Sequence, residues 1–456
     1  MATVSELENR LNSFDRVVRS EALAKLLAMV KSGDIKLPKP KNEVNLHIHT
    51  FFSFNAYGWS PTRIAWEARK YGLAIAGIVD FDVLDGMEEF LAACDTLEQR
   101  GVVSLETRVY VREYHDKVMS SPNEPGIAYF MVAGCFAPPE AHTKAADTLN
   151  LMREMARHRN IRVMERVNEY LDTVRIDYDK DVLPLTPSGN ATERHMLAAY
   201  DAKAREVFKG DQAALASFWA KALGMQVGQI EAVLSDTPKF HEIMRSKLMK
   251  FGGVGYVPPT PESFPTLETI VDMAAELGAL PTATWLDGTN PGEADMPAFL
   301  ELMASKGVVA MNIIPDRNWN IKDPEEKKIK VENLDKAIRA ARDAGMPLCV
   351  GTELNKLGQP FVDNFAAPEL RPYIRDFLDG AYFFWGHTFL ARTAGIGFCS
   401  EWAKANFGDD RLRKNEFYIA VGRVAQPQHV LADSLRRNLA EASPRQVIDM
   451  LSAEVG

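Results

Sequence analysis

Two histidines on one face of a predicted strand are the first residues in this chain whose spacing suggests chemistry. Apolar and polar residues alternate from position 44 to position 49, which is typical of a β-strand. Strand residues two positions apart lie roughly 6.6 Å apart on the same side, so His47 and His49 face the same way. Two such imidazoles can bind one metal ion together with carboxylates from neighbouring strands. A pair of hydrogen-bonded core histidines is the alternative that the motif leaves open.

Polar residues end several of the short apolar stretches that follow this strand. These stretches alternate with helical patterns, which predicts a parallel sheet. In a β/α barrel the carboxyl ends of the strands meet at one mouth, where active sites are built. We therefore expect the residues at these ends to gather around the histidines; the acidic ones are Asp80, Glu106, Asp316 and Glu353.

The order of these motifs resembles the polymerase and histidinol phosphatase (PHP) family. The stretch NLHIHTFFSFNAYGWSP, followed by GIVDFDVLDGMEEF, is similar to the opening of its members. VVSLETRV is similar to their glutamate-bearing third strand, and GTELNK to their terminal motif. The resemblance spans about residues 42–360 in the family's order. It implies a distorted seven-stranded β/α barrel, divalent metals and, as in most members, phosphoester hydrolysis.

Residue by residue, the resemblance implies one intact metal position. Its ligands are His47, His49, Glu106 and Glu353, where Glu353 stands in place of the family's aspartate and reaches one methylene further. The histidines of a second position fall near residues 129–131 and 284–285, where this chain has none.

A third metal position is lost, because Asn55, Phe81 and Asn355 stand where the family has ligands. We therefore expect one divalent ion, and at most two. Mixed imidazole and carboxylate ligands suit Mn, Fe or Zn.

Five further residues are candidates for binding or proton transfer. Asp80 can orient or deprotonate a water, and His195, in an Arg-His element that resembles one in some family insertions, can protonate a leaving group. Three basic residues can bind an anion: Arg194, Arg317 and Lys356. The alternatives are a capping carboxylate at Asp80, the start of a surface helix at 194–195, and exposed charges at the other two positions.

The periodicity divides the chain into a barrel with helical additions. The predicted fold is a distorted (β/α)7 barrel, PHP-like, with a helical insertion and helical N- and C-terminal extensions. The predicted segments are a helical extension (1–38), the first part of the barrel (42–145), the insertion (146–250), the second part of the barrel (251–365) and a C-terminal helical region (366–456).

Composition limits the partners that we expect. The formal net charge of −9 disfavours nonspecific binding to nucleic acid or anionic membranes. No apolar run is long enough to span a bilayer. The four cysteines form no CxxC pair, which predicts free thiols and a cytoplasmic location. The expected partner is a small, phosphorylated substrate, and the oligomeric state stays open.

These patterns favour a metal-dependent hydrolase, with phosphoester cleavage by a metal-activated water as the working hypothesis. One alternative is a mononuclear hydrolase that cleaves an amide or a lactone. The other is a binding or scaffold protein that has lost catalysis and kept one structural metal. An open coordination position beside a deep pocket would favour an enzyme.

Overall fold

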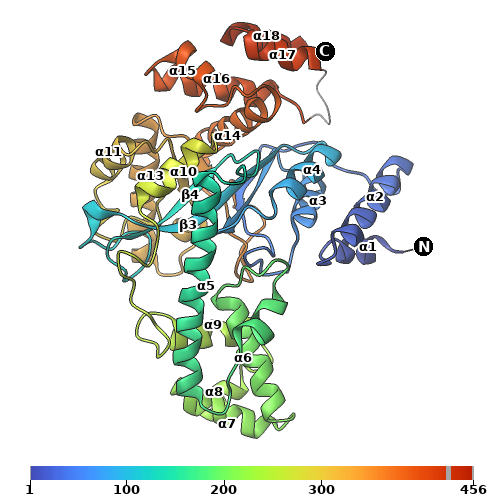
Figure 1. Cartoon of the computed structure of the whole chain (residues 1–456). Helices are drawn as coiled ribbons and strands as arrows, with labels where there is room; N and C mark the ends of the chain where they lie inside the picture. The colour runs from blue at the N-terminus through green and yellow to red at the C-terminus, as the bar shows by residue number, and fades with distance from the viewer. Residues whose placement is uncertain (1, 428–432, 454–456) are drawn as a thin grey trace.

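Seven strands form one sheet that closes into a distorted β/α barrel, as the sequence predicts (Figure 1). The computed structural model describes residues 2–427 and 433–453. The strands follow one another around the sheet in chain order: β1 (Val44–Ile48), β2 (Ile75–Phe81), β3 (Gly101–Tyr110), β4 (Ile127–Ala133), β5 (Leu280–Thr284), β6 (Ala310–Ile313) and β7 (Leu348–Val350). Just beyond β7, the backbone of Glu353 closes the ring. Its amide donates to the carbonyl of His47 at 2.7 Å, and its carbonyl accepts from the amide of His49 at 2.9 Å.

One strand contradicts the parallel sheet that we predicted. β4 runs antiparallel to both β3 and β5, whereas the other neighbouring strands are parallel. The reason lies in residues 111–126, which hold only the short 3₁₀ turn η1 (Arg112–Tyr114) in place of the helix that usually connects parallel strands. β3 also continues to Tyr110 instead of ending at Glu106, so Glu106 and Arg108 both lie within the strand.

Helices cover the outside of the barrel. α3 shows how the sequence sets their bounds: Ser60 caps the first turn through the amide of Arg63, Pro61 occupies the first position, and Gly72 ends the helix at φ +87°. The helices between the strands are α3 (Pro61–Tyr71), α4 (Met87–Leu97), α10 (Leu267–Glu276), α11 (Met296–Ser305), α12 (Asp316–Trp319) and α13 (Pro324–Asp343).

The structure describes every residue between β4 and β5, and these residues form helices and loops without a strand. α5 (Lys144–Leu171) has 28 residues and spans about 42 Å. Its first half packs on the barrel core through Met152, and its second half joins a separate core through Val167. Between α5 and α10 lie η2 (Tyr178–Val182), η3 (Leu183–Leu185), α6 (Glu193–Val207), α7 (Gln212–Leu223), α8 (Val227–Glu231), α9 (Thr237–Met244) and η4 (Arg245–Met249).

The C-terminal helices lie at the end of the barrel away from these insertion helices (Figure 1). A Cβ at Gly380 would lie 2.0 Å from the carbonyl oxygen of Leu348, so glycine lets α14 approach β7 closely. The elements of this region are η5 (Arg371–Tyr373), α14 (Ile374–Ala394), α15 (Glu401–Phe407), α16 (Arg411–Val424), α17 (Asp433–Glu441) and α18 (Pro444–Ala453). Among the described residues, no helix is both long and apolar enough to cross a membrane.

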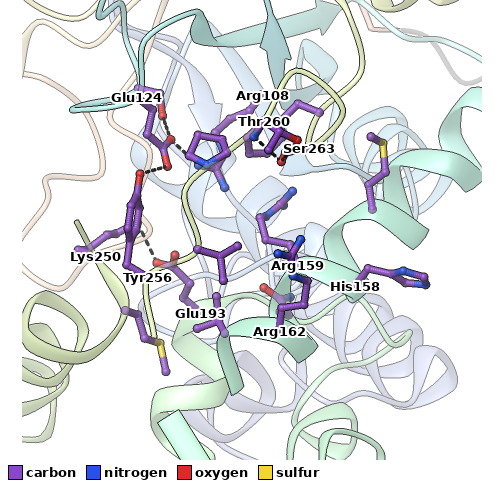
Figure 2. A pocket seen from close by; sticks show the side chains of 18 of the residues that line it. Arg108, Glu124, His158, Arg159, Arg162, Glu193, Lys250, Tyr256, Thr260 and Ser263 are labelled. Atoms are coloured by element: carbon purple, nitrogen blue, oxygen red, sulfur yellow. Dashed lines mark hydrogen bonds and ion pairs between the residues drawn. The ribbon is translucent and has the colours of Figure 1, made fainter. Parts of the chain in front are cut away.

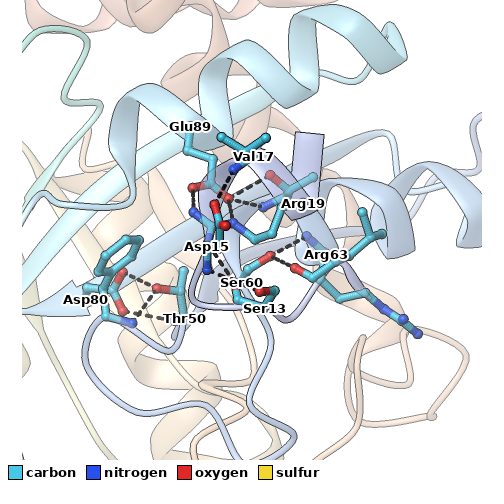
Figure 3. A network of polar contacts seen from close by, with 12 residues as sticks. Ser13, Asp15, Val17, Arg19, Thr50, Ser60, Arg63, Asp80 and Glu89 are labelled. Carbon is cyan, nitrogen blue, oxygen red and sulfur yellow. Dashed lines mark hydrogen bonds and ion pairs between the residues drawn. The ribbon is translucent and has the colours of Figure 1, made fainter. Parts of the chain in front are cut away.

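A buried ion pair fastens the N-terminal helices to the barrel (Figure 3). These helices are α1 (Val4–Arg10) and α2 (Arg16–Ser32). Arg19 of α2 donates from Nε to Oε1 of Glu89 at 2.8 Å, and its Nη2 contacts the other carboxylate oxygen. Oε1 of Glu89 also accepts from the hydroxyl of Thr62 at 2.6 Å. Because both charged side chains are buried, each depends on the other for compensation.

Candidate metal centre

His47, His49 and Glu106 bring three ligand atoms together inside the barrel. The Nε2 atom of each histidine lies 3.5 Å from Oε2 of Glu106. All three side chains are buried, and their ligand atoms lie within 4.8 Å of one another. Neither Nε2 atom has a hydrogen-bond partner among the described residues. Buried polar atoms without partners are rare, and two imidazoles facing one carboxylate match a transition-metal donor set.

Two polar side chains behind the histidines fix their ring orientation. Nδ1 of His47 lies 3.1 Å from Oδ1 of Asn312. An amide oxygen only accepts, so Nδ1 of His47 holds the proton and Nε2 presents its lone pair to Glu106. Nδ1 of His49 lies 3.1 Å from the hydroxyl of Ser53, which itself donates to Asp80 at 2.6 Å. Ser53 therefore accepts from His49, and both rings present Nε2 to the same point, as metal-binding histidines do.

The three groups polarise one another in the absence of a metal. Burial opposes the charge of Glu106, but His47 and His49 outweigh it and lower the pKa of Glu106 to about 2. Burial likewise opposes a proton on His47, but the carboxylate of Glu106 outweighs it and raises the pKa of His47 above its usual range. A proton on His47 thus partly takes the place that a metal cation would fill.

Asp80 lies behind the histidines and does not line the cavity beside them. Its oxygens accept from the amide of Thr50 at 2.9 Å, from the hydroxyl of Thr50 at 2.7 Å and from Ser53. Burial raises the pKa of Asp80, against the effect of its hydrogen bond with Ser53. The carboxylate that we expected to act on water is therefore occupied by the loop after β1.

His195 is not among the residues that line the cavity beside Glu106. Its Nδ1 accepts from the amide of Thr192 at 3.0 Å, which makes it part of the cap of α6. Burial lowers the pKa of His195 to about 4. The ring is neutral near neutral pH and contacts Phe54 edge-on.

Glu353 is held by a cation and does not join the three-residue cluster. Nη2 of Arg317 lies 2.9 Å from each of its carboxylate oxygens, and Nε2 of Gln359 donates to Oε2 at 3.1 Å. Burial opposes the charge of Glu353, but Arg317 and the two histidines outweigh it and lower the pKa of Glu353. The structure thus brings together three of the four expected ligands and pairs the fourth with an expected anion-binding residue.

Phe81, Asn55 and Asn355, which stand where the family resemblance implies ligands, make other contacts or line the neighbouring cavity. The ring of Phe81 stacks on His49 with centroids 4.4 Å apart. The amide of Asn55 donates to the carbonyl of His49 at 2.8 Å, and its oxygen accepts from two backbone amides of the following loop. Asn355 lines the neighbouring cavity. In the part of the chain that the structure describes, His47, His49 and Glu106 are the one cluster suited to a metal.

A cavity of about 400 Å³ opens beside Glu106, between the barrel and the insertion. The amide of Asn190 joins the two parts by donating to the carbonyl of Phe81 at 2.8 Å. Although the whole chain is acidic, basic side chains outnumber acidic ones around this cavity. The basic ones are Arg108, Arg159, Arg194, Arg245, Lys250, Arg317 and Lys356; the acidic ones are Asp82, Glu106, Glu193, Glu242 and Glu353.

Three of these basic residues, Arg194, Arg317 and Lys356, were expected from the sequence, and the other four were not. Arg194 and Lys356 line the cavity, where Arg194 pairs with Glu242 and Lys356 is exposed. Arg108 could have been identified from the sequence, because it lies two positions after Glu106 and shares its face of β3. Asn312 also had a signal, as the single amide in an otherwise apolar strand. Nothing in the sequence placed Arg159 of the insertion at this cavity.

Comparisons with known proteins add little to these observations. No protein-family model matches the chain, and no curated protein matches its sequence. Among solved structures, a candidate metal-dependent phosphoesterase from Bifidobacterium adolescentis aligns with a TM-score of 0.44 and 15% identity, covering 75% of this chain and 98% of that one. An amidohydrolase from Chromobacterium violaceum, with bound sulfate and no metal, aligns with a TM-score of 0.47 and 15% identity, covering 74% and 96%. Membership of the PHP family therefore stays a prediction from the motifs.

Proposed function

We propose that this protein is a metal-dependent hydrolase that acts on a small phosphoester. One observation supports the metal above all others: the unpartnered Nε2 atoms of His47 and His49 both face Oε2 of Glu106. His47, His49 and Glu106 would hold one divalent ion of Mn, Fe or Zn. Three protein ligands are also the usual number in catalytic zinc sites, which keep one position for water.

A metal bound there would polarise a substrate oxygen and lower the pKa of a bound water. The protein's own residues hold the ligands in place. Asn312 fixes the ring of His47, and Asp80 fixes the ring of His49 through Ser53. We therefore propose a positioning role for Asp80 in place of direct action on water. We likewise propose a structural role for His195, because its Nδ1 is used in a helix cap.

The charge of the adjoining cavity favours a phosphoester over other substrates. Its lining has more cations than carboxylates, and guanidinium groups match the geometry of phosphate oxygens. Lys356 is exposed and pairs with no carboxylate in the described part of the chain, so it is available to a phosphoryl group. Arg194 and Arg317 add positive charge while they remain paired with Glu242 and Glu353.

A mononuclear amide or lactone hydrolase is the second candidate. The observation that favours it is the one three-residue cluster, since such hydrolases work with a single metal. A scaffold protein with a structural metal is less favoured, because structural sites usually have four protein ligands and Glu353 is withheld from this one by Arg317.

The test is turnover by protein loaded separately with Mn, Fe or Zn. The substrate panel contains phosphomonoesters, phosphodiesters, amides and lactones. We expect phosphoester turnover in the wild type and a loss of at least about 100-fold in Glu106→Gln. Glu169→Gln, on the exposed side of α5, is the matched control and should keep full activity. Turnover of amides or lactones alone would support the second candidate. Equal activity in Glu106→Gln would contradict the assigned site.

A further inference from the structure

Arg159 of α5 lies at the junction of two cavities, and its guanidinium has no ion pair or hydrogen bond in the described part of the chain. It lines both the cavity beside Glu106 and a larger neighbouring one of about 670 Å³. Among the described residues, no carboxylate or hydrogen-bond acceptor pairs with it. Burial and the charge of Arg108 lower the pKa of Arg159 to about 10. Arg159 is half-buried, and a half-buried charge without an ion-pair partner is destabilising, so this arrangement needs a physical reason.

Arg108 places a second guanidinium beside the first (Figure 2). The Cζ atoms of Arg108 and Arg159 lie 4.2 Å and 4.6 Å from the centroid of the same ring, that of Phe264. Nη1 of Arg108 donates to Glu124 at 2.8 Å, which uses only part of its donor set. Two like charges near one ring repel each other. Glu124 forms an ion pair with Arg108 and not with Arg159, on which Asp82, Glu193 and Glu124 act without direct contact.

Three other insertion cations that line these cavities have carboxylate partners. Arg245 and Lys250 each lie 2.9 Å from Glu193. Arg194 pairs with Glu242. Arg159 has no such partner, although Glu193 lines the same space. The exposed Arg162 lines the larger cavity and has no ion pair among the described residues either, but of these two only Arg159 is half-buried and lines both cavities.

The position of the pair relates it to the metal centre. Glu106 and Arg108 are two residues apart on β3, so they share a face and lie roughly 6.6 Å apart along the strand. Tyr129 is opposite Arg108 in the register of β4 and lines both cavities. The lining of the larger cavity also includes apolar side chains such as Met155 and Met249, which suit the organic part of a molecule.

We propose that Arg108 and Arg159 form a second oxyanion subsite, which binds an anionic group of the substrate that is not at the metal centre. The proposal rests on the proposed function and narrows it to small molecules with two anionic groups. Planar guanidinium groups bind phosphate or carboxylate through paired N–H donors, and an anion here would compensate the charge that Arg159 leaves unpaired.

Anion binding to a protein without the metal centre tests this subsite directly. The protein is the His47→Ala/His49→Ala double variant, titrated by calorimetry with inorganic sulfate and, separately, with acetate. We expect one bound anion per chain, with sulfate the tighter if the natural group is a phosphate and acetate if it is a carboxylate. Adding Arg159→Gln should weaken that binding by roughly tenfold or more. Arg157→Gln is the matched control, because Arg157 lies on the same helix and pairs with Asp179 outside both cavities.

A stability measurement separates the subsite from a purely structural role. If Arg159 serves an absent anion, Arg159→Gln should unfold at the same temperature as its parent, or higher, in anion-poor buffer. Added sulfate should raise the unfolding temperature of the parent more than that of the variant. Three results would overturn the subsite: neither anion binds, Arg159→Gln binds as tightly as its parent, or Arg159→Gln unfolds at a lower temperature than its parent. Binding that depends on Arg159 without any hydrolysis would contradict only the proposed function.

Discussion

Arg317 holds the carboxylate of Glu353, with Nη2 2.9 Å from each oxygen. The backbone of Glu353 meanwhile closes the barrel against His47 and His49. Where the chain makes both contacts, Glu353 and Leu354 adopt φ values of +66° and +53°. Residues other than glycine rarely adopt such positive φ values. Such strain persists only where the surrounding structure enforces it, and it clusters at functional sites. The pair therefore keeps a carboxylate near the metal centre but away from the metal ligands.

Removing Arg317 should strengthen metal binding. In Arg317→Met, the site loses a nearby positive charge and Glu353 becomes free to act as a ligand. We expect the metal dissociation constant to fall about tenfold, the scale on which residues behind the ligands change affinity. Competition with a chelating dye measures it. Lys356→Met removes a cation that is not bonded to Glu353 and should have a much smaller effect. Unchanged or weaker binding in Arg317→Met would contradict this relationship.

Metal affinity should fall as the pH is lowered, because His47 takes up a proton. Its pKa is raised by Glu106 after burial has opposed it, so below that pKa the ring holds a proton that the metal must displace. Glu106, with a pKa of about 2, stays ionised throughout and adds no dependence. Affinity measured between about pH 5 and pH 9 should therefore drop on the acid side of a midpoint above the ordinary value near 6.5.

The metal-free protein should show the opposite trend in stability. The protonated His47 is stabilised by Glu106, so this contribution is complete below the unfolded pKa and is lost as pH rises through the folded one. Urea unfolding of metal-free wild type against His47→Gln measures the difference. If the wild type instead gains stability relative to His47→Gln as the pH rises across this range, the pKa of His47 is not raised.

Ser53 should matter for metal binding although it touches no metal. In Ser53→Ala, Nδ1 of His49 loses its acceptor and Asp80 loses a donor. We expect affinity to fall by about tenfold or more. Ser104→Ala is a matched control, because Ser104 is buried on β3 and its hydroxyl has no partner among the described residues. Equal affinity in the two variants would refute the positioning role of Ser53 and Asp80.

The buried pair of Arg19 and Glu89 should dominate the attachment of the N-terminal helices. Glu89→Gln leaves Arg19 charged and uncompensated, which costs about 3–5 kcal/mol in comparable buried pairs. Glu21→Gln breaks a more exposed pair with Arg10 and should cost about 1 kcal/mol or less. Chemical denaturation measures both. Similar losses in the two variants would show that the buried pair contributes no more than a surface one.

The sequence predicted those features that depend on local pattern. The alternation around His47 predicted β1 and the shared face of its histidines. The direction of β4 was wrong, because residue alternation is the same in a parallel and an antiparallel strand and only the connection decides between them.

The functional role of a side chain depended on partners far away in the chain. Arg317 and Glu353 were both expected at the site, but no local pattern shows that they pair with each other. Asp80 ends a strand beside the site, and only the loop after β1 shows that its oxygens are occupied. Arg159 lies in a helical pattern more than 50 residues from the cluster, so its position depends on how the insertion packs.

Metal content decides whether His47, His49 and Glu106 form a metal centre. Protein purified without chelator and reloaded with Mn, Fe or Zn should contain one equivalent of metal per chain by elemental analysis. His47→Ala and His49→Ala should each lose that metal and remain folded, because the barrel core is large, whereas His158→Ala, on the exposed surface of α5, should retain it. Two results would contradict the assignment of His47, His49 and Glu106 as a metal centre: the wild type binds no metal after reloading, or His47→Ala and His49→Ala bind as much metal as the wild type.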